Sequence, residues 1–384
     1  MRYQQKEIHL KNTLSFWENF KNEERILFYN PIEQKLIMGA KRIKTFASGE
    51  SFHQYPYVFS SRTFFSEVKD EKWNGLGNET LAFAYYLVEK NGKQILYHAE
   101  KWFDIQDHKP VTKKHVYELL ADDYQEWQEV FSNVKQEILL QNVNKVVISR
   151  EAQIKCETAV DIPSVLRNLF EKNPNCFVFA YGKAGKTFLG ASPEMLVQKE
   201  GKQIISYALA GTILRSEQEQ DDQKKKTALL NDAKNRHEHQ IVVDCIAHIM
   251  KKYGDEVIIG ETTTMKLKNL YHLQSRIKAT DNENSSLTDW AWRLHPTPAM
   301  GGFPVQKSLD IISRCEKHER GLYAAPIGML NEHGDGVFIV GIRSALIEEN
   351  RVYAYAGSGI VNNSECTEEY AETSNKLKTI LESL

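Results

Sequence analysis

The sequence predicts an α+β protein in which helices pack on the outer faces of antiparallel β-sheets. Two observations lead to this fold class. Short apolar segments separated by turn residues fill residues 1–115 and resume at Lys145, as expected for strands joined by hairpins. Longer segments with apolar residues at steps of three and four lie between and after them, as expected for amphipathic helices. Strands in runs, with long helices between the runs, favour α+β over an alternating α/β fold.

A single unit with two lobes is expected for residues 1–384, because 41% of these residues are hydrophobic and can form one large core or two ordinary ones. Residues 1–115 would form the N-terminal lobe, and residues 140–384 carry the motifs. Lys plus Arg number 49 and Asp plus Glu number 51. This charge balance indicates neither nucleic acid nor an anionic membrane as a partner.

The cysteines and the N-terminus indicate the compartment. Five scattered cysteines form no CxxC pair, which argues against a zinc ribbon, an iron–sulfur cluster or a disulfide framework and fits a reducing cytosol. The N-terminus lacks the apolar core of a signal peptide. No segment approaches the roughly 18 apolar residues that a membrane span needs. We therefore expect a cytoplasmic protein.

The first half of the chain predicts strands and then a helix. The strand segments are KLIMGA, YVFSS and TLAFAYYLV. A helix is expected over residues 116–143, because its apolar residues recur at helical steps. These apolar residues are Leu119, Leu120, Tyr124, Trp127, Val130 and Phe131.

From Lys145 onward the sequence predicts an antiparallel meander. Its strands are KVVISREAQI, NCFVFAYG, TFLGA, MLVQKEG and QIISYALAG. A long helix should follow over about residues 223–252, with Gly254 as its C-cap. GVFIVGIRSALI and RVYAYAGSGIV are expected to pair as strands across a turn at residues 348–350, before a last helix from about Ser364.

The segment AKNRHEHQIVV raises the question of a metal site. His237 and His239 lie about 200° apart on a helix and cannot readily share an ion, and a zinc protease would need HExxH. Glu238 lies in line with apolar positions on the same helix. These positions are Ile241, Val242, Cys245 and Ile249. A carboxylate on an inward face needs a partner, which could be a basic side chain or a metal ion.

Acidic residues of the last helix offer a second half of such a site. Glu369, Glu372 and Lys376 share one helical face. A surface salt-bridge ladder would explain this spacing. A metal site would also explain it if Glu238 and Glu372 converge, and oxygen ligands with retained water suit Mg²⁺ rather than zinc.

Five further residues could contact a substrate. Arg343 shares its strand face with two small residues, which leaves room for a ligand carboxylate or a structural acid. Gly357 and Gly359 could bring the backbone close to a ligand or form a tight turn. Lys145 and Glu194 are either exposed charges or a base and an acid. As a base near pH 7, Lys145 would need a pKa well below about 10.4.

Eight segments occur in the order found in chorismate-utilising enzymes, and the chain resembles an isochorismate synthase over roughly residues 140–384. They are KVVISR, FLGASPEMLV, ALAGT, NRHEHQIVV, HPTPAMGGFP, ERGLYAAPIG, FIVGIRSALI and YAGSGIVNNSECTEEYAETSNKL. The resemblance implies the two-lobed fold of this family, with chorismate as substrate. It leaves open whether the product serves menaquinone or siderophore biosynthesis.

The resemblance also assigns roles to residues. It implies that Glu238 and Glu372 bind Mg²⁺, with Glu369 nearby or acting through water. It implies that Lys145 is the general base that activates water for attack at C2, and that Glu194 is the general acid that protonates the departing C4 hydroxyl. The residues that match substrate-binding positions are Thr212, His295, Tyr323, Arg343, Gly357, Gly359 and Lys376.

Lys145 favours water as the nucleophile, because the relatives that use ammonia usually lack this lysine and pair with a glutaminase. No glutaminase partner is therefore expected. Salicylate synthase, which adds pyruvate elimination, a non-catalytic chorismate-binding homologue and a zinc hydrolase are the alternatives. Asn235, Ala325 and Cys366 depart from the usual residues of the family, and Asn235 removes an acid that would stand near the metal ligands.

Overall fold

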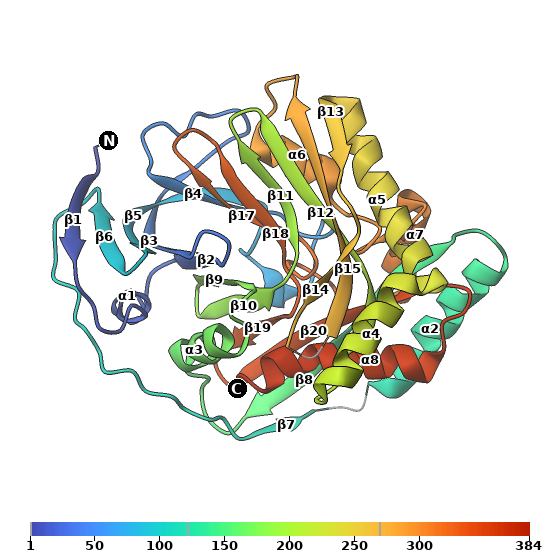
Figure 1. Cartoon of the computed structure of the whole chain (residues 1–384). Helices are drawn as coiled ribbons and strands as arrows, with labels where there is room; N and C mark the ends of the chain where they lie inside the picture. Colours follow the sequence, from blue (N-terminus) through green and yellow to red (C-terminus); the bar gives the residue numbers. More distant parts are fainter. Residues whose placement is uncertain (1, 121–122, 269) are drawn as a thin grey trace.

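The predicted α+β class is confirmed. The computed structural model describes residues 2–120, 123–268 and 270–384. Within this part of the chain every strand pairing is antiparallel, and the helices lie against the outside of the strands (Figure 1). None of the described helices is long and apolar enough to cross a membrane.

The strands form two ladders that share β5. The first ladder runs in the order β1 (Gln4–Ile8), β6 (Lys93–His98), β5 (Glu79–Lys90), β3 (Lys35–Thr45), β2 (Arg25–Asn30), β9 (Phe177–Lys183), β10 (Lys186–Ser192), β19 (Ser344–Glu348), β20 (Arg351–Ile360) and β8 (Lys145–Cys156), with β7 (Tyr117–Leu119) and β16 (Gly302–Phe303) also on β8. The second runs from β5 through β4 (Tyr57–Ser61), β17 (Pro326–Asn331), β18 (Gly336–Val340), β11 (Met195–Glu200) and β12 (Gln203–Leu214) to β15 (Leu270–Asp281), which also pairs with β13 (Gly254–Ile259) and β14 (Thr263–Lys266). Strands from the two halves of the sequence therefore share both ladders.

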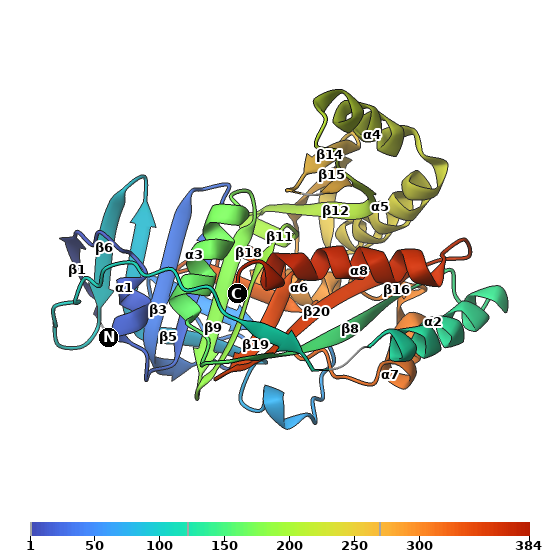
Figure 2. The ribbon, with the colours of Figure 1, turned by 90° about the horizontal axis from the view of Figure 1, so that it is seen from below.

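The helices close the outside of these ladders. They are α1 (Ser15–Asn19), η1 (Glu71–Trp73), α2 (Tyr124–Leu139), α3 (Ile162–Lys172), α4 (Glu219–Asn231), α5 (Ala233–Tyr253), α6 (Leu287–Leu294), α7 (Val305–Cys315) and α8 (Cys366–Leu381). One apolar core joins α5 and α6 to β11, β12 and β18. Another joins α1, α3 and α8 to β2, β9, β19 and β20. Figure 2 shows α8 beside β20, with α4 and α5 above it.

Two predicted helices differ from the structure. The helix expected over residues 116–143 begins only at Tyr124, because β7 pairs with β8 and leaves Leu119 exposed. The helix expected over residues 223–252 is divided at Asp232, which has extended backbone and accepts a hydrogen bond from the Asn235 amide. Asp232 is thus the N-cap of α5, which begins as a separate helix.

Two further sequence expectations concern backbone geometry. Gly254 is the C-cap of α5, as expected, but its φ of −153° is extended and it also begins β13. The strand expected across GVFIVGIRSALI ends at Val340 and resumes at Ser344. Arg343 between them has a φ of 52°, a left-handed conformation that turns the chain and is rare for a residue with a side chain. The chain thereby passes from the second ladder to the first.

Candidate active site

A cavity lies beside this turn and gathers most of the residues expected at the site. Its polar and glycine lining comprises Lys145, Glu194, Gly211, Thr212, Glu238, His272, Arg320, Tyr323, Arg343, Tyr355, Gly357, Ser358, Gly359, Glu372 and Lys376. They come from β8, β12, β15, β20, α5, α8 and the loops before β11, β17 and β19. Among the described residues, Glu369 and His295 do not belong to this lining.

Lys145 and Glu238 form an ion pair at one wall. Lys145 opens β8 with 1% of its surface exposed, and its Nζ lies 2.7 Å from Oε1 of Glu238 on α5. A Cβ on Gly359 would lie 2.7 Å from Cε of Lys145, so a larger residue at this position would force the lysine side chain to shift. The inward carboxylate of Glu238 is thus paired with a basic side chain here.

Glu194 faces the same cavity from the loop between β10 and β11. It is 5% exposed, and its backbone carbonyl accepts a hydrogen bond from the amide of Val340. Burial raises the pKa of Glu194 to about 7, although the charges of Arg343, Lys145 and Lys376 act in the opposite direction. A carboxyl group with this pKa can keep its proton near neutral pH and donate it during a reaction.

Arg343 provides an unsatisfied cation in the cavity wall. It is 9% exposed, and its buried Nη2 has no hydrogen-bond partner within the described residues. Such a group costs free energy unless a partner arrives. Tyr323 lies beside it and stacks on Tyr355 with ring centroids 5.3 Å apart, and burial raises the pKa of its hydroxyl. A ligand carboxylate would satisfy the guanidinium.

Acidic side chains of α8 meet at Ser358 on β20. The Ser358 hydroxyl donates to Glu369 and lies 3.3 Å from Oε1 of Glu372. Burial and then the charge of Glu372 raise the pKa of Glu369. Burial alone would raise the pKa of Glu372, but the ammonium of Lys376, 2.6 Å away, brings it below its usual value.

These carboxylates fit a hard divalent cation by their chemistry. They offer oxygen donors only, and the repulsion between Glu369 and Glu372 would fall if a cation bound there. Glu238 reaches the cavity beside Gly359, the residue after Ser358. In the part of the chain that is described, however, no three acidic, histidine or cysteine side chains are clustered closely enough to hold a metal. Glu238 and Glu372 would have to exchange their lysine partners for the cation.

The histidines differ in part from the sequence expectations. His295 does not line the cavity. Its Nε2 lies 3.3 Å from the carbonyl oxygen of Phe64 instead. His272 on β15 lines the cavity instead, with Nδ1 2.9 Å from the hydroxyl of Thr212. Burial, with Arg343 and Lys376, lowers the pKa of His272 to about 3, so this imidazole is neutral. No motif in the sequence pointed to it.

The histidines of the segment AKNRHEHQIVV do not share a ligand position. His237 is exposed, whereas His239 is 2% exposed and its Nε2 lies 2.8 Å from the hydroxyl of Ser275. Burial lowers the pKa of His239 to about 4. The two side chains therefore face different surroundings, as expected for positions two apart on a helix.

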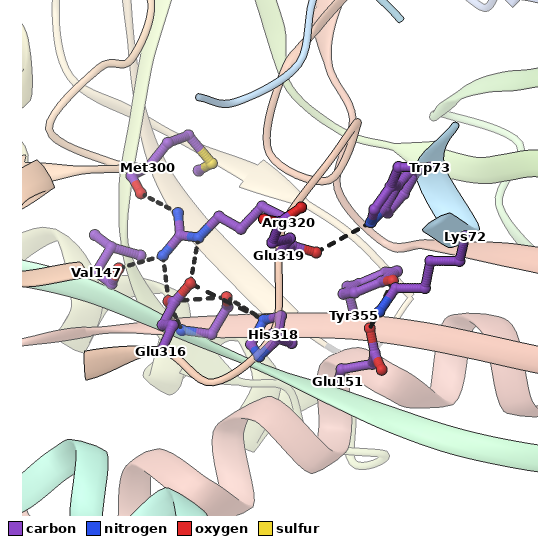
Figure 3. Close-up of polar contacts among 11 residues, drawn as sticks. Lys72, Trp73, Val147, Glu151, Met300, Glu316, His318, Glu319, Arg320 and Tyr355 are labelled. Atoms are coloured by element: carbon purple, nitrogen blue, oxygen red, sulfur yellow. Dashed lines mark hydrogen bonds and ion pairs between the residues drawn. The ribbon is translucent and has the colours of Figure 1, made fainter. Parts of the chain in front are cut away.

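A buried ion pair that includes the lining residue Arg320 stabilises the cavity wall (Figure 3). The guanidinium of Arg320 lies between its partners in Figure 3 and donates to both oxygens of Glu316, at 2.8 and 2.5 Å. It also donates to the carbonyls of Met300 and Val147, at 3.0 and 2.7 Å. Ser149 binds the same carboxylate through its amide and hydroxyl. The pair thus fastens β8 to the loop before β16, and both segments line the cavity.

Replacement of Arg320 by Met is expected to lower the free energy of unfolding by about 3–5 kcal/mol, because Glu316 would remain buried without its cation. Equilibrium unfolding in urea measures this loss. Arg314→Met is the control, since Arg314 is 65% exposed in its pair with Glu137 and should contribute at most about 1 kcal/mol. Equal losses in both variants would contradict a supporting role for Arg320.

Comparisons with known proteins show the family and the fold. The family model described as chorismate binding enzyme matches residues 98–384. Isochorismate synthase MenF of Bacillus subtilis is 39% identical over 68% of this chain and 56% of that protein, and isochorismate synthase EntC of Escherichia coli is 34% identical over 62% of each. The structure of the menaquinone-specific isochorismate synthase MenF of Escherichia coli has the same fold, with a TM-score of 0.84 at 22% identity over 99% of this chain and 94% of that one. The chain spans only about 56% to 62% of the length of the two curated relatives.

Proposed function

The chain belongs to the chorismate-binding enzyme family, and from this premise we propose that it converts chorismate to isochorismate in a reversible, Mg²⁺-dependent reaction. The observation that carries the proposal is that Lys145 and Glu194 line one cavity with the unpartnered Arg343. A base, an acid and a carboxylate-binding cation are thereby available to one substrate.

The proposed reaction needs one proton removed and one supplied. Neutral Lys145 takes a proton from water as its oxygen attacks C2, the ring double bonds shift, and Glu194 gives its proton to the C4 hydroxyl, which leaves as water. Arg343, Tyr323 and Lys376 would hold the substrate carboxylates. Water is thus both consumed and released, and an ammonia-supplying glutaminase partner is not required.

Glu238 and Glu372 are the proposed ligands of Mg²⁺, with Glu369 nearby or acting through water. When bound, the ion would neutralise the ring carboxylate of chorismate. Lys145 must be neutral to act as a base, whereas its present contact with Glu238 is that of an ammonium. Engagement of Glu238 by another cation would release Lys145 from this contact.

The products formed from chorismate test this proposal. The full chain is incubated with chorismate, with and without Mg²⁺, and the products are separated by chromatography. Isochorismate that forms only with Mg²⁺ is the expected result. Salicylate with pyruvate would instead identify a salicylate synthase, and no turnover would identify a non-catalytic chorismate-binding protein.

Glu238→Gln is expected to raise the Mg²⁺ concentration for half-maximal activity by at least about tenfold, because loss of one charged ligand commonly weakens a metal site by this order. A Mg²⁺ titration of the initial rate measures the shift. Glu368→Gln, an exposed change on α8 beside the site, is the control and should leave the titration unchanged. The same titration curve for Glu238→Gln would remove Glu238 from the metal site.

A further inference from the structure

A second cavity of about 340 Å³ adjoins the catalytic one. It lies between the end of α8, the segment after α3 and the turn between β14 and β15. Its lining includes Cys176, Leu267, Leu270 and Asn375. Pro193 and Arg343 line both cavities, so the two spaces adjoin at the residue whose buried Nη2 has no hydrogen-bond partner among the described residues.

The second cavity carries a strong excess of positive charge. The basic residues in its described lining are Lys172, Arg215, Lys266, Lys268, Lys378 and Arg343, and the acidic one is Glu382. Glu382 pairs with Lys268 at 2.7 Å, and Arg215 pairs with Asp222. Within the described chain, Lys266 and Lys378 form no ion pair, and Lys378 donates only to the amide oxygen of Asn375. These exposed cations are therefore available to an anion.

Arg343 acts electrostatically on both spaces. Burial raises the pKa of Cys176 in the second cavity to about 12 and that of Glu194 in the catalytic cavity to about 7, and the charge of Arg343 opposes both rises. The guanidinium therefore lies within reach of groups on either side. An anion held by Lys266 and Lys378 would be attracted onward to the most deeply buried cation of the path.

We propose that the second cavity is an anion-binding antechamber, in which the dicarboxylate substrate is held by Lys266 and Lys378 before Arg343 receives it in the catalytic cavity. This inference rests on the proposed function, since it takes chorismate as the dianion. A basic recess with low-dielectric walls raises the local concentration of an anion and its association rate. The antechamber would contribute to the rate of substrate capture and leave the chemical step to Lys145 and Glu194.

Charge reversal tests the antechamber. Association and dissociation rate constants of chorismate are measured on the immobilised full chain by surface plasmon resonance, at low and high salt and with Mg²⁺ present. For Lys266→Glu/Lys378→Glu we expect an association rate constant about tenfold lower at low salt, a weaker salt dependence and a nearly unchanged dissociation rate constant. The matched control is Lys251→Glu/Lys307→Glu, which makes the same change of net charge at exposed positions on α5 and α7.

Each outcome decides the inference. An unchanged association rate constant, or the same decrease in the control, overturns the antechamber even if the enzyme turns chorismate over. Loss of a second bound chorismate without a slower association would show a separate anion site and also overturns the route. A slower association in a protein that binds but does not convert chorismate would keep the antechamber and reject the proposed reaction. Absence of chorismate binding to the wild type overturns both.

Discussion

Lys145→Ala is expected to lower kcat for isochorismate formation by about 10²- to 10⁴-fold, the range that a positioned general base contributes. The alanine leaves no group at this wall to take the proton of the attacking water. Chromatography of isochorismate formed at saturating chorismate and Mg²⁺ measures the change. KM should change far less than kcat, because Arg343 and Lys376 remain in place to hold the substrate carboxylates.

Lys155→Ala is the matched control, since Lys155 is exposed near the other end of the same strand, β8. It should retain the wild-type kcat. The removal of Lys145 also deprives Glu238 of its ion-pair partner, so the thermal midpoint and the Mg²⁺ titration of the variant must be recorded beside its rate. A folded, Mg²⁺-binding Lys145→Ala protein with kcat close to that of the wild type would exclude Lys145 as the base.

Local sequence patterns predicted most of the strands. The segments expected as strands from Lys145 onward are β8 to β12, and β19 and β20 pair across the expected turn. The expected meander of these five strands was wrong, because only β9–β10 and β11–β12 pair with each other, while β8 pairs with β20 and β11 with β18. Apolar periodicity failed where tertiary contacts or caps decide the outcome. Leu119 fits the apolar periodicity of a helix, yet it lies in a strand because β7 pairs with β8. Asp232 ends one helix and caps the next, and the periodicity on either side conceals this boundary.

The turn at Arg343 could not be predicted from its neighbours. The apolar residues Val340 and Ile342 beside it favour strands, and alternation along one continuous strand is the natural expectation. The break depends on a distant segment, since a Cβ on Gly341 would lie 2.6 Å from the carbonyl oxygen of Leu322. This close approach lets the chain change ladders, and it directs Arg343 to the cavity by a positive φ rather than by strand alternation.

The residues of the site could be predicted mainly from the sequence motifs. Spacing alone placed Glu238 on an inward face but left its partner open, and the structure pairs it with Lys145, 93 positions earlier in the chain. Such a contact depends on the packing of α5 on β12 and β15, which brings Glu238 to the start of β8 and which no local pattern reveals. His272 was missed for the same reason, because its neutral imidazole acts through a hydrogen bond with Thr212 and lies in an ordinary strand.

Glu194→Gln is expected to lower kcat by about 10²- to 10⁴-fold, because the amide has no proton to give to the departing hydroxyl. Its size and burial are close to those of the protonated acid, so the fold should be preserved. Initial rates from pH 5.5 to 9 measure both the loss and its pH dependence. Glu200→Gln, an exposed change at the end of β11, is the control.

The pH profile distinguishes an acid from a group that only packs. Burial raises the pKa of Glu194 to about 7, and an acid works only in its protonated form. The wild-type kcat should therefore fall as pH rises through about 7, by about tenfold for each further pH unit. This fall should be absent from the residual activity of Glu194→Gln, since glutamine does not titrate. If the variant keeps the same alkaline fall, another group supplies the proton, and Glu194 contributes only to the shape and charge of the cavity.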